Sequence, residues 1–232
     1  MSNVEMQTLN AQRSPTVAEQ VFGYLRERIL TLEMPPGTKL SEVEVSKKLG
    51  VSRQPVREAF FRLSQLGFLL IRPQRATVVR PFSEVEVLRA MYIRSALEIE
   101  VVRDAIKIVS DEQLKTLSDL LDAQNQAVID DDKVLFHTLD DRFHKHICEI
   151  ANAGYVWTLI KEKKAHMDRV RYLTLELGAK FALDEHREIF NAIKSKDSNL
   201  AVKTMRKHLS RIKIDLPRIR QENQHYFSEE AE

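Results

Sequence analysis

Residues 38–67 constrain the fold of this chain most, because they combine the signals of two short helices joined by a tight turn. The first helix is expected to end at Gly50, since glycine readily adopts the left-handed conformation that closes a helix. The second is expected to begin after Ser52, a favoured N-cap residue, and Pro55 is tolerated in its first turn. Each helix places apolar residues on one side: Leu40, Val43, Val45 and Leu49 in the first, and Val56, Ala59, Phe60 and Leu63 in the second. The pattern predicts a helix-turn-helix.

The first turn of the second helix carries two guanidinium groups and an amide, from Arg53, Gln54 and Arg57. They lie on the polar side of the helix, opposite its apolar side. In a major groove, arginine pairs with guanine and glutamine with adenine. This helix end is therefore expected to contact DNA. The alternative is an ordinary pair of core helices, which requires the cap, the proline and the arginines to coincide by chance.

The flanking residues extend this motif to a winged helix-turn-helix. Residues 14–33 repeat apolar positions at helical spacing and predict a preceding helix. Residues 68–71 and 77–79 resemble two short strands around a basic tip. Gln74 and Arg75 in this tip are the expected wing contacts to phosphate or minor groove. A solvated turn without DNA contact remains open for either residue alone.

The charge distribution favours two domains of different function. Residues 13–80 hold 12 Lys/Arg and 6 Asp/Glu, whereas the residues from 81 onward hold 24 and 27. A basic module beside a slightly acidic one is typical of a DNA-binding domain joined to a domain that does not bind DNA. We expect a DNA-binding domain at 13–80 and an all-helical effector, metal-binding and dimerisation domain at 81–220.

The second domain is expected to be an all-α bundle, which makes the whole chain mainly α. Beyond Pro81, glycine and proline are nearly absent until Pro217. Apolar residues recur at helical intervals and predict about six helices: roughly 84–109, 111–130, 132–151, 154–177, 181–195 and 197–214. The first dozen residues and the tail from about 221 are polar and are expected to be loose.

The sequence also indicates a compartment. It has no run of 18 apolar residues and no signal-peptide pattern, which argues against membrane insertion and secretion. Its one cysteine permits no internal disulfide and fits a reducing cytoplasm.

One constellation in the predicted bundle is able to bind a metal. Asp140 and His144 are four residues apart and project from one helix face. With His186 and His208 they supply one carboxylate and three imidazoles, a ligand set for a first-row transition metal. On spacing alone, surface or hydrogen-bonded core histidines are the better interpretation, because seven histidines allow many such combinations.

Arg94 is a second candidate, because it falls among apolar residues of the first predicted bundle helix. A guanidinium that faces a cavity can hold a carboxylate through paired hydrogen bonds. The alternative is a buried ion pair with Glu98, four residues further on. Arg169 or Arg171 could place a further arginine near the same pocket, although a solvated face explains both equally well.

The segments K-L-S-E, L-G-V-S-R-Q-P-V-R-E-A and L-x-x-x-G-F strongly resemble the GntR family of bacterial transcriptional regulators over roughly residues 15–80. The resemblance implies that the arginines, Gln54 and Pro55 meet the operator. Gln54 replaces the threonine that is common in the family, and Val43 stands where some members use an arginine. The expected DNA-binding residues are Ser52, Arg53, Gln54, Pro55, Arg57, Gln74 and Arg75.

The C-terminal region resembles the FCD-type ligand-binding domain of the FadR-like branch of that family. The matching segments are D-D-R-F-H at residues 140–144, E-H-R-x-I at 185–189 and His208-Leu209. The resemblance implies a Zn or Ni site formed by Asp140, His144, His186 and His208, and it tips the balance towards a metal. It implies Arg94 near the acid group of an effector. Asp141 and Cys148 are weaker ligand candidates, and six helices suggest the shorter, VanR-like version.

Together these patterns predict a cytoplasmic, homodimeric, sequence-specific regulator, expected to be a repressor, that binds an inverted repeat in double-stranded DNA. A small organic or sugar acid at the metal-containing pocket and Arg94 would control operator binding. Two alternatives remain: a metal-dependent hydrolase or lyase fused to a DNA-binding head, and a dimer that binds DNA without regard to sequence.

Overall fold

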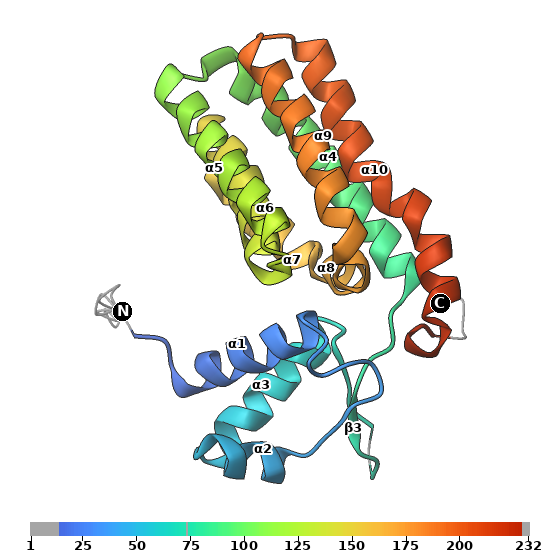
Figure 1. The fold of residues 1–232 in the computed structure, drawn as a ribbon. Coiled ribbons are helices and arrows are strands. Elements are labelled where there is room, and N and C mark those ends of the chain that lie inside the picture. Colours follow the sequence, from blue (N-terminus) through green and yellow to red (C-terminus); the bar gives the residue numbers. More distant parts are fainter. Residues whose placement is uncertain (1–13, 73, 229–232) are drawn as a thin grey trace, which may run out of the picture. The chain divides into compact units, whose positions relative to one another are not determined.

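The structure is a computed structural model that describes residues 14–72 and 74–228. The chain divides into two units between Arg80 and Pro81. Figure 1 colours the first unit from blue to cyan and the second from green to red. The expected DNA-binding domain started at residue 13, which lies outside the described residues, as do the first dozen.

Among its described residues, the first unit contains three helices and three short strands, of which Figure 1 labels α1, α2, α3 and β3. In chain order these are α1 (Val17–Leu30), β1 (Lys39–Leu40), α2 (Glu42–Leu49), α3 (Arg53–Gln65), β2 (Leu69–Leu70) and β3 (Thr77–Val79). Helices α1 and α3 pack together and bury a small apolar core that includes Leu25, Ile29, Phe60 and Leu63. The unit is a winged helix-turn-helix.

The turn between α2 and α3 forms as its residues dictate. Gly50 ends α2 with a φ of 65°, in the left-handed region that favours glycine. Ser41 is the N-cap residue of α2, and its hydroxyl accepts a hydrogen bond from the backbone N–H of Glu44. Ser52 occupies the N-cap position of α3 in an extended conformation, but its hydroxyl makes no capping hydrogen bond.

The wing is a three-stranded antiparallel sheet rather than the expected two-stranded hairpin. The central strand β3 pairs with β2 on one side and with β1 on the other, where Lys39 lies opposite Val78. A two-residue strand such as β1 has too little sequence to show an alternating pattern. Gln74 and Arg75 are exposed at the tip, and Gln74 adopts a φ of 56°.

The second unit contains seven α-helices among its described residues. These are α4 (Glu84–Ile108), α5 (Asp111–Ile129), α6 (Lys133–Ile150), α7 (Gly154–Lys163), α8 (Ala165–Arg171), α9 (Leu175–Lys194) and α10 (Ser198–Glu222), with single 3-10 turns at Tyr172–Thr174 and Gln224–Tyr226. One apolar core joins α4, α5, α6, α7, α9 and α10 and contains Phe136, Phe143, Ile147, Ile160 and Ile193. The all-α expectation is confirmed.

The expected count of six helices is wrong, because the helix predicted at 154–177 is divided. It breaks at Lys164, α8 ends at Arg171, and the next helix begins at Leu175 instead of 181. At the break, the fully buried Lys164 ammonium lies 2.7 Å from Asp141 and 2.6 Å from Asp168. The spacing of apolar residues along one helix does not predict a contact with a residue on another helix. The count therefore gives no support for the shorter, VanR-like version.

The C-terminal tail also differs from expectation. Helix α10 continues through Pro217 to Glu222 instead of ending near 214, and the chain packs again at Phe227. The Phe227 ring meets the Phe82 ring edge-on with 5.2 Å between centroids. Backbone hydrogen bonds join Phe82 to Tyr226 (2.7 Å) and to Ser228 (3.0 Å). The tail through residue 228 is therefore anchored to the start of the second unit.

None of the helices in the described part of the chain is long and apolar enough to cross a membrane.

Two glycines of the first unit should respond to alanine in opposite directions. A methyl group at Gly50 or Gly23 meets no atom within 4 Å, so only the backbone conformation differs. Gly50→Ala should lower the free energy of unfolding by about 1–2 kcal/mol, since alanine is strained at positive φ. Gly23→Ala lies inside α1 and should raise it by about 0.5–1 kcal/mol. Denaturant unfolding of the full chain measures both, and shifts of the same sign would contradict the turn assignment.

Candidate functional sites

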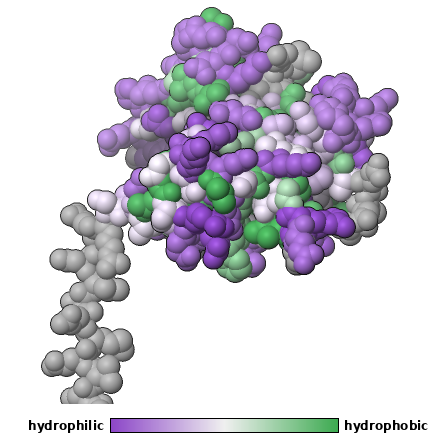
Figure 2. All heavy atoms as spheres, turned by 90° about the horizontal axis from the view of Figure 1, so that it is seen from below, coloured by the Kyte–Doolittle hydropathy of each residue, from purple (hydrophilic) through white to green (hydrophobic). Residues whose placement is uncertain are grey.

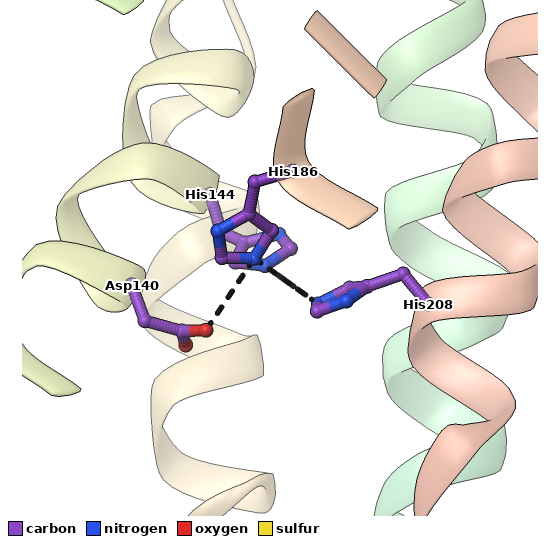
Figure 3. A group of neighbouring side chains, drawn as sticks. All are labelled: Asp140, His144, His186 and His208. Atoms are coloured by element: carbon purple, nitrogen blue, oxygen red, sulfur yellow. Dashed lines mark hydrogen bonds and ion pairs between the residues drawn. The ribbon is translucent and has the colours of Figure 1, made fainter. Parts of the chain in front are cut away.

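Four predicted ligand residues meet inside the second unit. Asp140 and His144 come from α6, His186 from α9 and His208 from α10, and all four are buried. Figure 3 shows their side chains pointing towards one another. Their potential ligand atoms all lie within 4.8 Å of one another. The fold thus assembles the whole predicted set from three helices.

The outer nitrogen of His186 is held by a buried amide. Its Nδ1 lies 2.8 Å from Gln124 Oε1 on α5. The Gln124 Nε2 donates to the backbone oxygen of Leu139 (3.2 Å), which leaves Oε1 as the acceptor. His186 must therefore carry its proton on Nδ1, and the lone pair of Nε2 faces the cluster.

Glu185 holds the outer nitrogen of His208. Its Oε2 lies 3.1 Å from His208 Nδ1, and Arg211 Nη2 donates to its other oxygen at 2.6 Å. Burial by itself raises the pKa of Glu185, but the hydrogen bonds from His208 and Arg211 outweigh it and lower the pKa to about 2. An ionised carboxylate only accepts, so the proton of His208 sits on Nδ1.

Glu98 on α4 fixes His144 in the same way. Its Oε2 lies 2.5 Å from His144 Nδ1, and its Oε1 accepts from Arg94 Nε at 2.5 Å. Burial opposes ionisation, but the positive charge of Arg94 and the contact with His144 lower the pKa of Glu98 to about 2. Glu98 is therefore an acceptor, and His144 carries a proton on Nδ1 and turns its Nε2 towards the cluster.

Three Nε2 atoms consequently converge. His208 Nε2 lies 3.2 Å from His144 Nε2 and 3.3 Å from His186 Nε2. Lone pairs at this separation repel unless a proton or a cation lies between them. Burial, followed by the neighbouring His208, lowers the pKa of His186 well below its ordinary value, and burial lowers that of His208 to about 4. Neutral imidazoles are the form that binds transition metals.

Asp140 completes the donor set with a negative charge. Its Oδ1 lies 3.5 Å from His186 Nε2 and 3.2 Å from Arg171 Nη2. Burial raises its pKa, but Arg171 and the histidines more than compensate, and the pKa lies well below its usual range. One carboxylate oxygen and three imidazole nitrogens match the ligands of a divalent transition metal. The residues present therefore fit such an ion.

The weaker ligand candidates lie outside this group. Asp141, which directly follows Asp140 in the sequence, forms an ion pair with Lys164 instead. Cys148 is buried, and burial raises its pKa to about 12, which disfavours the thiolate that a metal requires.

Arg94 lies in a buried ion pair and also borders a cavity. It forms the buried ion pair with Glu98, and it also lines a cavity of about 50 Å³. Its Nη2 is buried and has no hydrogen-bond partner among the described residues. The cavity wall also contains Phe136, Met167, Arg171, His208 and Arg211. A histidine of the cluster and three guanidiniums thus border one small space.

The predicted DNA-contacting residues are accessible at the start of α3. The side chains of Arg53 and Arg57 are each 59% exposed, and Ser52 and Gln54 are exposed as well. Pro55 is half-buried. In Figure 2, which views the chain from the α2 and α3 end of Figure 1, hydrophilic residues dominate and apolar residues are scattered.

Sequence reasoning missed the residues that orient the site. Gln124 has no local signal, because it is 62 residues from His186. Glu185 directly precedes the predicted ligand His186, and it accepts a hydrogen bond from another predicted ligand, His208. Its position beside a predicted ligand was a signal that could have identified it. Glu42 on α2, which contacts both recognition arginines, was also not predicted.

Known proteins match the chain along almost its whole length. Residues 17–79 match the model of bacterial regulatory proteins of the gntR family, and residues 89–211 match the FCD domain. The HTH-type transcriptional repressor RspR of Escherichia coli (strain K12) is 38% identical over 231 residues, covering 96% of this chain and all of that protein. A probable D-xylose utilization operon transcriptional repressor of Paenarthrobacter nicotinovorans is 28% identical, over 84% of this chain and 86% of its own.

Solved structures share the fold. E. coli McbR/YncC superimposes with a TM-score of 0.73 at 21% identity, over 90% of this chain and 99% of that one. A putative GntR regulator from Rhodococcus sp. RHA1 gives 0.71 at 22% identity, over 86% and 97%.

A winged helix-turn-helix followed by an all-helical domain with a buried donor cluster defines a DNA-binding transcriptional regulator. The chain belongs to the gntR family of bacterial regulatory proteins and carries an FCD domain. The resemblance read from the sequence is confirmed. The hydrolase or lyase alternative is wrong, because the family and these relatives are transcriptional regulators and not enzymes.

Proposed function

We propose that this chain is a homodimeric repressor whose operator binding is controlled by a small organic or sugar acid bound beside a divalent transition metal, Zn or Ni, in the FCD domain. The observation that carries the proposal is the convergence of three Nε2 atoms next to the cavity that Arg94 lines. Repression, rather than activation, is supported by two relatives that are named transcriptional repressors.

The metal would be held by Asp140, His144, His186 and His208. A bound ion supplies a Lewis-acidic contact for an oxygen of the effector. The chain's own contribution is to aim the imidazoles through Gln124, Glu185 and Glu98, while burial keeps His186 and His208 neutral. Such outer partners set the tautomer and orientation of histidine ligands.

The effector's acid group would meet Arg94. Its buried Nη2 can donate towards the cavity while Nε stays bonded to Glu98. A buried guanidinium without a second acceptor favours a carboxylate over a neutral ligand. The small cavity, about 50 Å³, suits the head group of a small acid.

The DNA would meet the first turn of α3 and the wing. The first N–H groups of a helix lack partners within the helix and attract phosphate. Since the Ser52 hydroxyl does not cap α3, it is available for the same phosphate. Arg53, Gln54 and Arg57 would read base edges, Pro55 would pack against the backbone, and Gln74 and Arg75 would reach from the wing. A short recognition helix gains specificity when a symmetric dimer uses it twice on an inverted repeat. The dimer would act in the cytoplasm.

Helix α8 offers a route from the effector to the chain segment that leads to the DNA-binding unit. Met167 and Arg171 line the cavity, and Arg171 also holds Asp140. Between them, the buried Arg169 guanidinium lies 4.8 Å over the ring of Phe82, two residues after the first unit ends. A ligand that favours one position of α8 would shift Phe82 and thereby the population of DNA-binding arrangements.

Removing two ligands should abolish metal binding. After loading with Zn and dialysis, we expect His186→Ala with His208→Ala to lower the metal content from about one ion per chain to near zero. His146→Ala, on the same helix as His144 but in contact with Glu149, should retain it. Elemental analysis measures the metal and circular dichroism checks the helices. Wild-type metal content in the folded double variant would overturn the ligand set.

The recognition arginines should matter for sequence discrimination. On a duplex selected from a random pool by the wild-type protein, Arg53→Ala or Arg57→Ala should lose about 1–3 kcal/mol of binding free energy. The loss of binding free energy on a scrambled duplex of the same composition should be smaller, because binding there depends on phosphate contacts, which carry no sequence information. Equal losses on both duplexes would favour the dimer that binds DNA without regard to sequence.

A thermal-shift screen of small organic and sugar acids on Zn-loaded protein tests the effector site. A ligand of the native state raises the melting temperature. Arg94→Met should abolish the shift of any hit and should change Zn content and operator affinity much less, because Glu98 loses only one of its two partners. Arg103→Met, exposed on the same helix, should keep the shift. A shift that survives in Arg94→Met would exclude Arg94 as the effector contact.

A further inference from the structure

Glu42 is an acidic residue beside the two recognition arginines. It is the first residue of α2, and its side chain is 28% exposed. A single oxygen, Oε2, accepts a hydrogen bond from Arg57 Nε at 3.4 Å and lies 3.6 Å from Arg53 Nη2. Both contacts reach across the turn from one helix to the next. One carboxylate therefore links the pair of guanidiniums.

This link restricts side chains that would otherwise move freely. Arginine has many rotamers, and a bidentate contact with a base requires one orientation of its planar fork. Holding both arginines at one point before binding reduces the ordering that DNA binding demands. The expected consequence is a gain in discrimination between sequences.

The charge of Glu42 acts in the opposite sense on overall affinity. Phosphates dominate sequence-independent binding, and a carboxylate on the DNA-facing side repels them. Replacing Glu42 by glutamine should therefore strengthen binding to arbitrary DNA and weaken binding to the correct sequence. A residue that only stabilises the helix would not separate these two quantities.

The same helix turn provides a matched control. Glu44 lies in the first turn of α2 as well, and its described contacts include no arginine. Glu44→Gln removes the same charge from the same helix end. Glu42→Asp keeps the charge at the start of α2 but withdraws the carboxylate from the arginines by one methylene.

We propose that Glu42 is a specificity-determining positioning residue, which holds Arg53 and Arg57 in the directions from which they read base edges. The proposal rests on the proposed function, because it requires that these arginines contact bases. It adds a residue on the preceding helix to the recognition surface.

The test compares dissociation constants for the selected duplex and its scrambled counterpart in wild type, Glu42→Gln, Glu42→Asp and Glu44→Gln. The dissociation constant for the scrambled duplex divided by that for the selected duplex measures discrimination. This ratio should fall about tenfold in both Glu42 variants, and it should stay near the wild-type value in Glu44→Gln. In a background of Arg53→Ala with Arg57→Ala, Glu42→Gln should no longer change the ratio. Melting temperatures of all variants show whether α2 itself is weakened.

Three results would overturn the proposal. These are an unchanged ratio in Glu42→Gln, a wild-type ratio in Glu42→Asp, and an equal fall in Glu44→Gln. If the two arginine variants alone leave the ratio unchanged, the recognition surface of the proposed function fails instead. The two failures are therefore distinguishable.

Discussion

The FCD domain depends on how its three central imidazoles are held from outside. An amide oxygen and two carboxylates hold the Nδ1 sides of His186, His208 and His144, so every Nε2 faces inward. Burial then disfavours protonation of the inner nitrogens. An arrangement that excludes protons and concentrates lone pairs beside the ionised Asp140 is suited to a divalent cation, and it explains why buried polar groups occupy the centre of an apolar bundle.

The same outer partners tie this centre to the rest of the domain. Glu98 holds His144 with one oxygen and Arg94 with the other, so the cluster and the cavity wall share one carboxylate. On the far side, Arg171 holds Asp140 from α8. The neighbouring Arg169 lies over Phe82 at the start of the unit. A change in the cavity thus has a short packed path to the segment that continues into the DNA-binding unit.

The sequence predicted those features that are encoded locally. The spacing of Asp140 and His144 places both on one helix face, and the residues around Gly50 specify the turn before the recognition helix. The features it could not predict depend on distant residues. Gln124 meets His186 across 62 positions, and the buried Lys164 ammonium lies between Asp141 of α6 and Asp168 of α8. The anchored tail similarly depends on Phe82, which lies far away in the sequence. Recognition of the family supplied the full ligand set, which spacing alone left open.

The positions of the protons on the cluster histidines are tested most directly by ¹⁵N NMR of the histidine side chains in the metal-free protein. The account predicts that His186 and His208 are neutral near pH 7, each with a protonated Nδ1 and a bare Nε2, and that added Zn shifts the Nε2 resonances of all three histidines. A protonated Nε2 on His186 or His208, or doubly protonated rings that persist at this pH, would contradict it.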